Sequence, residues 1–332
     1  MEFYLKLLQS SFWAKHKSAF GWDSHFFPYK NNLILVLTRS IALSYSFAYI
    51  PFGFTLKMLS QQELKEFVKN LLEHYPKLLF VRLDLLDYKC FSIDEGIDIS
   101  YPFKIPSFLK KTSSVQPPDT VILPLTDVSL DQILSTMHKK CRYNIRLAQK
   151  KGVVVKNYES KRALNELEKW YNLYEITAKR DSIAIHSYDY YRSLFELSLD
   201  PSFGVTLSLF LAYHEEDLLA GIIVLIYENQ AIYLYGASSN TKRDYMPSYL
   251  LQWHAISYAK QKGALWYDFF GIPPTNDTKH PMHGLYRFKT GFGGTLLHRC
   301  GAYDYPIKKG LYWLFRFIEK FRLFYFKVIK KR

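Results

Sequence analysis

Short apolar runs and one helical pattern alternate along the first third of the chain. We predict, in order, a strand at 33–37, a strand at 42–49, a helix at 61–74 and a strand at 78–83. Pro51 follows the second strand, and Pro76 stops the helix. Asp84 directly follows this last strand.

A similar order of elements follows a segment rich in proline at 101–120, which we interpret as a linker. The pattern predicts strands at 121–125, 153–155, 205–213, 221–227, 230–235 and 266–270, with helices at 130–151, 161–180, 188–199 and 247–263. Gly152 suits the C-cap of the basic helix at 130–151. Strands and helices mixed in this way indicate an α/β or α+β fold with central sheets.

The segment 306–332 reads as a long aromatic helix. It carries nine basic residues against one acid, Glu319. It could be a docked terminal helix with a solvated basic face. It could also be a platform for the phosphates of RNA or of an anionic membrane surface, which we favour because the charge is so one-sided.

The composition supports a folded protein with a polyanionic partner. The 332 residues are 48% hydrophobic and 17% aromatic, enough for two packed domains, and the formal net charge is +14. Three scattered cysteines suggest a reducing compartment, and no signal segment or membrane span is evident. We therefore expect a cytoplasmic protein.

Four segments carry motifs that occur in a fixed order along the chain. They begin at Gln9 (QSSFWAKHK), at His138 (HKKCRYNIRLAQKKGV), at Tyr235 (YGASSN, running on to Trp253) and at Tyr267 (YDFFG, then GLYRFKTGFGG from Gly284). Together they resemble the Fem family of non-ribosomal peptidyltransferases. The resemblance covers nearly the whole chain. It implies two tandem acetyltransferase-like (GNAT-like) domains with central mixed sheets, expected at 1–119 and 120–302. The basic C-terminal helix, 303–332, is expected to pack on the first domain.

The family resemblance implies a tRNA-dependent transfer of an amino acid to the stem peptide of a peptidoglycan precursor. No long heptad pattern predicts a projecting helical arm, so the chain is similar to the compact members. The acceptor, UDP-MurNAc-pentapeptide or lipid II, stays open, as do the amino acid and the accepting amine. Peripheral contact with the anionic inner leaflet of the membrane is a further expectation.

The resemblance places Phe288 and Lys289 at the reaction centre. A fixed cation beside the ester carbonyl would stabilise the tetrahedral oxyanion, and nearby glycines would let the backbone approach a ligand. The alternative is a surface lysine in a glycine loop. Asp84 could accept a proton from the attacking ammonium, or it could simply pair with Arg82 on the same strand face, which we favour.

Five residues are candidates for binding the precursor. Lys17 is four positions from Trp13, so both share one helix face, and the resemblance implies that Lys17 contacts the diphosphate. A solvated lysine is the alternative. His186, ahead of Tyr190, stands where compact relatives place an arginine, so a structural histidine is the favoured interpretation. Tyr235 would line the muropeptide cleft or belong to the core.

The basic helix predicts an RNA contact. Lys139, Arg142, Arg146 and Lys150 recur at three- and four-residue spacing and form one stripe, while Asn144 and its neighbour would face inward. Such a stripe can follow the phosphates of aminoacyl-tRNA without reading bases.

Several motifs are absent from the sequence. We find no pyrophosphate loop for coenzyme A, no Walker loop, no zinc spacing and no Gly-x-Ser-x-Gly elbow. We therefore expect no cofactor and no metal, with a donor that arrives already activated. Two other functions stay open: an acyltransferase using coenzyme A or tRNA with another acceptor, and a non-catalytic protein that binds RNA or a membrane surface.

Overall fold

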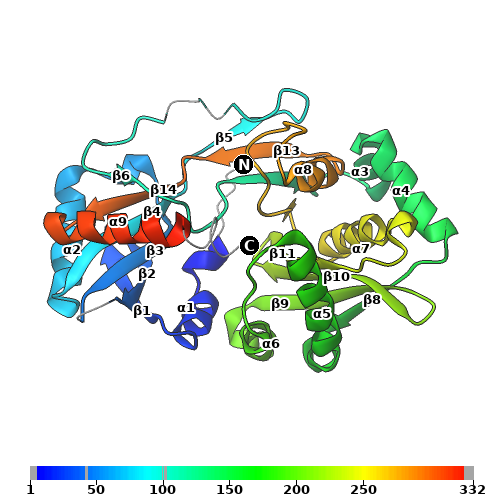
Figure 1. The fold of residues 1–332 in the computed structure, drawn as a ribbon, viewed down its shortest axis with the longest axis horizontal. Helices are drawn as coiled ribbons and strands as arrows, with labels where there is room; N and C mark the ends of the chain where they lie inside the picture. The colour runs from blue at the N-terminus through cyan, green and yellow to red at the C-terminus, as the bar shows by residue number, and fades with distance from the viewer. Residues whose placement is uncertain (1–5, 42–43, 99, 101–102, 325–332) are drawn as a thin grey trace. The chain divides into compact units, whose positions relative to one another are not determined.

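The computed structural model describes residues 6–41, 44–98, 100 and 103–324, with side chains up to position 321 in the last helix (Figure 1). The chain forms two compact units. Unit 1 comprises Met1–Asp87, Pro102–Gln116 and Cys300–Arg332, and unit 2 comprises Tyr88–Tyr101 and Pro117–Arg299. Each is described by itself.

Unit 1 is built on a six-stranded sheet in the order β1-β2-β3-β4-β14-β6. The strands are β1 (Asp23–Tyr29), β2 (Asn32–Ser40), β3 (Ser46–Phe54), β4 (Leu78–Leu85), β6 (Lys110–Lys111) and β14 (Ala302–Pro306). Strands β3 and β4 are parallel and the other neighbours are antiparallel, so the sheet is mixed.

The described residues of unit 1 form the α-helices α1 (Ser11–Ser18), α2 (Gln61–His74) and α9 (Lys309–Phe324). Helix α2 has the predicted bounds, because Ser60 and Glu63 form a capping box at its start. Every residue of β4 is buried. Phe67 of α2 packs in the core on one side, and Tyr312 of α9 packs against Phe80 on the other. Both faces of this strand are therefore covered.

Unit 2 is built on an eight-stranded sheet in the order β5-β13-β7-β12-β11-β10-β9-β8. The strands are β5 (Tyr88–Phe91), β7 (Asp119–Pro124), β8 (Val154–Glu159), β9 (Val205–His214), β10 (Asp217–Tyr227), β11 (Gln230–Ser238), β12 (Trp266–Asp268) and β13 (Thr295–Arg299). Only β11 and β12 pair in parallel among these described neighbours.

Helices cover both faces of the second sheet. They are α3 (Leu130–Thr136), α4 (Lys139–Lys150), α5 (Ser160–Asp181), α6 (Tyr188–Leu197), α7 (Pro247–Gln261) and α8 (His283–Thr290). Alternate residues of β10 separate the faces. Ile222 and Val224 join the core that includes α4 and α7, whereas Gly221 lies against Trp170 of α5.

The fold class is confirmed as mixed α/β with two mixed sheets. The predicted helix 130–151 is wrong as a single element, because Met137 and His138 are extended and separate α3 from α4. The amide of His138 donates to the carbonyl of Gly291 at 2.9 Å, a tertiary bond that local spacing does not reveal.

Other differences concern elements that the pattern did not show. Strands β1, β5, β6, β13 and β14 and helix α8 were not anticipated, and β6 falls inside the expected linker. The predicted domain boundaries lie at 119/120 and 302/303, and each predicted domain is continuous in sequence. The compact units of the structure are not continuous, since residues 88–101 belong to unit 2 and residues 300–302 belong to unit 1. Parts of the predicted strand 42–49, linker 101–120 and helix 306–332 lie outside the described residues, at 42–43, 101–102 and 325–332.

Candidate functional site

Lys289 lies in the last turn of α8 and is buried, so the alternative of a surface lysine in a glycine loop is wrong. Its Nζ donates to the carbonyl oxygens of Phe269 at 2.7 Å, of Gly271 at 2.9 Å and of Phe270 between them. Three acceptors match the three protons of an ammonium, so this carbonyl cage fits the charged lysine.

Burial works against that charge. Desolvation lowers the pKa of Lys289 from 10.5 to about 7, although the carboxylate of Asp268 opposes the shift. The ammonium is thus held where it can lose its proton near neutral pH. Proton-transfer groups of enzymes are commonly tuned into this range.

Asp268 shapes the cage. Its Oδ1 accepts from the amide of Phe270 at 2.7 Å and from the hydroxyl of Thr120, which ties the end of β12 to β7. Phe270 and Gly271 both have positive φ, 49° and 28°. This turn aims three successive carbonyls at Lys289, and the left-handed phenylalanine costs about 1–2 kcal/mol. Asp268 belongs to a segment that carries the family resemblance, but its contacts in the cage depend on the fold and were not predicted.

Tyr233 covers the Lys289 ammonium. Nζ lies 4.9 Å from the ring centroid, within range of a cation–π contact. The register of β11 shifts beside Leu234, since Ile223 pairs with Tyr235 and Val224 with Tyr233. A bulge of this kind re-aims side chains near a site. Tyr233 is two positions before Tyr235 and was missed because the pattern shows only a strand of aromatic residues.

The glycines after Lys289 serve packing, which corrects the expectation of an open backbone for a ligand. Gly294 has φ +96°, and a Cβ there would lie 2.5 Å from the carbonyl oxygen of Ile122. A Cβ at Gly293 would lie 3.3 Å from the carbonyl of Thr136. Phe288, half-buried beside Lys289, stacks edge-on against Tyr249 at a centroid distance of 5.0 Å.

Three of the predicted precursor-binding residues meet in an aromatic cluster of unit 2. The exposed ring of His186 stacks on the buried Tyr190, with centroids 3.8 Å apart and planes 14° apart. Tyr235 is half-buried and packs edge-on against Tyr191 at 5.0 Å. Burial raises the pKa of Tyr190 to about 12, and the hydroxyls of Tyr190 and Tyr235 interact.

The other two predicted precursor-binding residues, Trp13 and Lys17, meet in unit 1 as their spacing predicted. The Lys17 ammonium lies 5.7 Å from the Trp13 ring and 5.6 Å from the Trp22 ring. The guanidinium of Arg39 lies 5.5 Å from the same Trp22 ring. Desolvation, and then the charge of Arg39, lower the pKa of Lys17 to about 8.

Two cations held at one indole favour an anionic ligand. Arg39 was missed in the sequence because it lies on β2, far from the helix that carries Lys17. Its strand pairing supplied no chemical signal, since the residue opposite it on β3 is Phe47.

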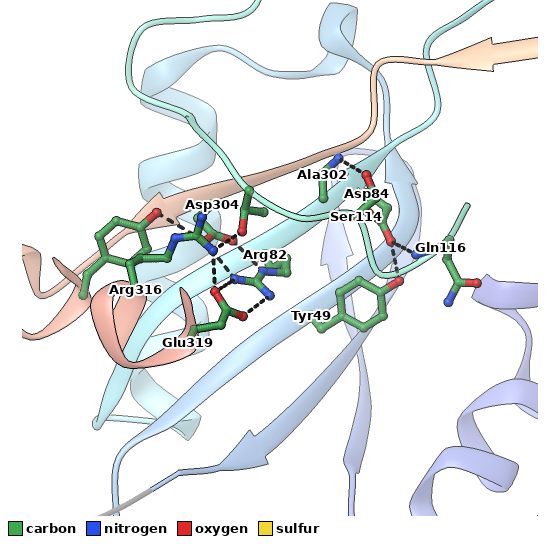
Figure 2. Close-up of polar contacts among 11 residues, drawn as sticks. Tyr49, Arg82, Asp84, Ser114, Gln116, Ala302, Asp304, Arg316 and Glu319 are labelled. Atoms are coloured by element: carbon green, nitrogen blue, oxygen red, sulfur yellow. Dashed lines mark hydrogen bonds and ion pairs between the residues drawn. The ribbon is translucent and has the colours of Figure 1, made fainter. Parts of the chain in front are cut away.

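Asp84 lies in β4 with its carboxylate buried (Figure 2). Oδ2 accepts from the hydroxyl of Tyr49 at 2.5 Å and from the amide of Gln116 at 3.2 Å. Oδ1 is buried with no hydrogen-bond partner among the described residues. Burial raises the pKa of this carboxyl, and the bonds from Tyr49 and Gln116 oppose the rise.

The expected ion pair between Asp84 and Arg82 is wrong. Arg82 donates to Asp304 on β14 through Nε at 2.8 Å and Nη2 at 3.0 Å, and to Glu319 of α9 through Nη1 at 2.9 Å (Figure 2). Asp304 is the cross-strand neighbour of Arg82. The partner was missed because it lies 222 positions away in the chain.

Helix α4 presents three of its four predicted RNA-contacting cations to solvent. Lys139, Arg146 and Lys150 are exposed. Arg142 is half-buried and donates to the carbonyls of Ser135 at 2.9 Å and Met137 at 2.5 Å, so it caps the end of α3. Asn144 and Ile145 face inward as predicted.

An aromatic residue accompanies these cations. Tyr143 is 63% exposed and lies four positions after Lys139 and three before Arg146. Its ring is available for stacking against a nucleobase. Tyr143 was not predicted as an RNA contact, because the prediction for this helix depended on its charges alone.

Two further features of the described part of the chain concern metal binding and membrane spanning. No cluster of three or more His, Cys, Asp or Glu side chains that could hold a metal ion occurs there. Within the same residues, no helix combines the length and the apolar character needed to cross a bilayer.

The two mixed sheets define a known class of fold. The solved structure of FemX superposes with a TM-score of 0.71 at 21% identity, covering 93% of this chain and 94% of that one. The C-terminal domain of a putative lysylphosphatidylglycerol synthetase from Agrobacterium fabrum superposes with a TM-score of 0.55 at 10% identity, covering 91% and 89%.

The sequence comparisons show the family. The FemAB family model matches residues 98–217 and 198–320. The chain therefore belongs to the FemAB family. It is 23% identical to the lipid II:glycine glycyltransferase of Staphylococcus aureus (strain USA300), over 93% of this chain and 90% of that protein. The roles predicted for individual side chains stay predictions.

Proposed function

We propose that this chain is an enzyme that transfers an amino acid from aminoacyl-tRNA to the stem peptide of a peptidoglycan precursor. Membership of the FemAB family and the likeness to a lipid II:glycine glycyltransferase support aminoacyl transfer to such a precursor. The observation that carries the proposal is Lys289, a buried lysine held by three carbonyls in the segment that matches the family.

The reaction joins two substrates without a resident cofactor. The amine nitrogen of the acceptor forms a bond to the carbonyl carbon of the aminoacyl ester, and the ester C–O bond breaks. The proton lost by the amine ends on the ribose hydroxyl that leaves. Charge develops on the carbonyl oxygen in the tetrahedral intermediate, so a fixed cation lowers the barrier by about 3 kcal/mol.

Lys289 supplies the positive charge in this proposal. Its three N–H bonds are directed at the carbonyls of Phe269, Phe270 and Gly271, so the ammonium acts on the oxyanion first through its field. A buried charge acts more strongly than an exposed one because water does not screen it. With a pKa of about 7, Lys289 can also release one of these carbonyls and give that proton to the leaving ribose oxygen, which becomes the hydroxyl.

Different side chains suit different parts of the precursor. Lys17 and Arg39, both at the Trp22 ring, suit the diphosphate of the precursor. The rings of Tyr190 and Tyr235 suit the sugar and stem peptide, and His186 stacks at the same place.

Three further roles complete the proposal. Lys139, Arg146 and Lys150 of α4 follow the tRNA backbone. Asp84, with its raised pKa, is the candidate acceptor of the amine proton. The basic aromatic helix α9 supports peripheral association with the anionic inner face of the membrane.

The test follows label from aminoacyl-tRNA into muropeptide. Purified chain is incubated with glycyl-, alanyl- and seryl-tRNA and with UDP-MurNAc-pentapeptide or lipid II, and products are read by mass spectrometry. Lys289→Ala is compared with Lys279→Ala, which removes an exposed lysine ten positions earlier. We expect RNase-sensitive transfer that falls about 100-fold in Lys289→Ala only.

Two results would overturn the proposal. Acyl transfer from a coenzyme A thioester that survives RNase would assign a different donor. Binding of tRNA without transfer to either precursor would leave a non-catalytic RNA-binding protein.

A further inference from the structure

The outward face of α9 is the largest group of exposed apolar side chains on any described helix. Trp313, Leu314, Phe317, Ile318 and Phe321 are between 55% and 70% exposed. We call these five residues the outward face. Contiguous apolar surface of this kind marks a site that binds another apolar surface.

The helix cannot turn to hide these side chains. Its inward stripe is fixed by Tyr312, which is fully buried against Phe80, and by Arg316 and Glu319. Glu319 accepts from Arg82 and from Arg316 (Figure 2). Arg316 also donates to Thr112. The buried network therefore holds the outward face toward solvent.

The charges on α9 also differ between its two sides, with the acid on the inward side and lysines exposed to solvent. Glu319 is the only acidic residue of α9, and it forms ion pairs with the buried side chains of Arg82 and Arg316. Lys309 and Lys320 are exposed, and no acid follows Glu319 in the sequence. The exposed side thus combines aromatic and aliphatic residues with positive charge and lacks a carboxylate.

We infer that the outward face of α9 is a membrane-binding surface, with α9 lying in the interfacial plane of a bilayer that contains anionic lipids. Sixteen residues span about 24 Å, and amphipathic helices of this chemistry bury their apolar side about 5–10 Å deep. The inference rests on the peripheral association proposed above and assigns it to one face.

Other occupants fit this face less well. An RNA backbone would be met by cations at the centre of the face, whereas Leu314, Phe317 and Ile318 lie there. A second copy of this chain would set two basic helices against each other. Trp and Phe beside Lys are the residue types that settle at the boundary between lipid headgroups and acyl chains.

The surface adjoins the proposed diphosphate site within unit 1. Phe315 of α9 contacts Phe47 at a centroid distance of 6.3 Å, and Phe47 contacts Trp22 at 5.6 Å. Trp22 is the ring at which Lys17 and Arg39 lie. A membrane-bound α9 would hold these cations near the headgroup level, where the diphosphate of a lipid-linked precursor is found.

The test uses the full chain with vesicles of phosphatidylcholine alone and of equal parts phosphatidylcholine and phosphatidylglycerol. Sedimentation measures binding, and brominated lipids report the depth of tryptophan. We compare wild type with a triple variant, Trp313→Ser, Phe317→Ser and Phe321→Ser. The control Leu33→Ser removes an apolar residue that is 65% exposed on β2.

We expect wild type and Leu33→Ser to bind the anionic vesicles and bromine to quench their fluorescence. The triple variant should bind at least about tenfold more weakly, since it loses three of the apolar side chains that would enter the bilayer. Its circular dichroism melting curve should match wild type because the changed side chains are exposed. Lys309→Gln with Lys320→Gln should weaken binding less and reduce its salt dependence.

Other outcomes overturn the inference. Equal binding by the triple variant, or no binding by wild type, would remove the membrane assignment. A dimer of wild type that the triple variant loses would assign the face to a second copy, and loss of tRNA binding instead would assign it to RNA. Transfer to the soluble precursor is read in the same variants, so failure of transfer with vesicle binding intact would sink only the proposed reaction.

Discussion

The hydroxyl of Tyr233 fills the space where a side chain on Gly236 would stand. A Cβ at Gly236 would lie 1.9 Å from that oxygen and 2.8 Å from the ring carbon that bears it. The same ring lies 4.9 Å from the Lys289 ammonium. The absence of a side chain at Gly236 therefore leaves the space that the Tyr233 ring needs to cover the carbonyl cage.

Gly236→Ala is expected to displace Tyr233 and to lower the rate of transfer. A misplacement near 1 Å costs on the order of 100-fold in rate, and overpacking lowers the free energy of unfolding by about 1–3 kcal/mol. Kinetics and urea unfolding measure the two effects. Gly284→Ala on α8 is the matched control because a Cβ there meets nothing within 4 Å. Equal rates for both variants would count against a role for Tyr233.

Lys289 predicts a pH dependence of stability. Its pKa is about 7 in the folded chain and 10.5 when unfolded, so the unfolded state binds more protons between these values. The free energy of unfolding of wild type relative to Lys289→Met should therefore rise from pH 7 to 10.5, by up to about 5 kcal/mol. Denaturant titrations across this window measure it. A difference that does not change with pH would show that Lys289 keeps an ordinary pKa.

The cations of α4 predict a salt dependence of tRNA binding. Replacing Lys139, Arg146 and Lys150 with Glu should weaken binding and reduce the slope of log affinity against log salt by about 2–3. Filter binding at several salt concentrations measures the slope. Arg142→Ala should leave most of the slope intact and instead lower the melting temperature, since it removes the cap on α3. A slope unchanged by the triple replacement would move the RNA site elsewhere.

The buried charge network predicts non-additive stability. Arg82→Met leaves Asp304 and Glu319 with one arginine and should lower the free energy of unfolding by about 3–5 kcal/mol. Adding Glu319→Gln removes one negative charge, so that the charge of Arg316 again balances that of Asp304. The double variant should therefore have a higher free energy of unfolding than Arg82→Met alone. Urea unfolding of the full cycle checks this, and simple additivity would show that the charges act independently.

Arg39 predicts a change in acceptor affinity. Because its charge helps to lower the pKa of Lys17, Arg39→Ala should raise that pKa from about 8. The KM for the precursor should rise a few-fold, roughly 0.5–1 kcal/mol for an exposed charge, with kcat little changed. NMR titration of methylated lysine and steady-state kinetics give the two values. Lys15→Ala, an exposed lysine on α1, should alter neither.

Local signals were sufficient for much of the fold. The bounds of α2 follow from helical spacing and from Pro76, and the strands of unit 2 other than β5 and β13 follow from apolar runs of the right length. The contact of Lys17 with Trp13 follows from helical spacing. Each of these depends on residues within a few positions of one another.

Features set by distant contacts were not predictable. The break between α3 and α4 depends on the bond from His138 to Gly291, and the burial of Lys289 depends on carbonyls that follow β12. Arg82 and Asp84 share a strand face as predicted, yet Arg82 pairs with residues of the C-terminal segment. A sequence shows that a charge is present, and the fold decides which charge it meets.

The pairing of Arg82 with Asp304 also sets an order of assembly during translation. The whole of 117–299 emerges from the ribosome between these two partners, so unit 2 can close while β4 still lacks β14 and α9. Until Asp304 and Glu319 have been synthesised, burial of this face of β4 would leave the guanidinium of Arg82 buried without a carboxylate partner. Unit 1 carries the N-terminal residues, yet it can be completed only after all of unit 2 has been synthesised.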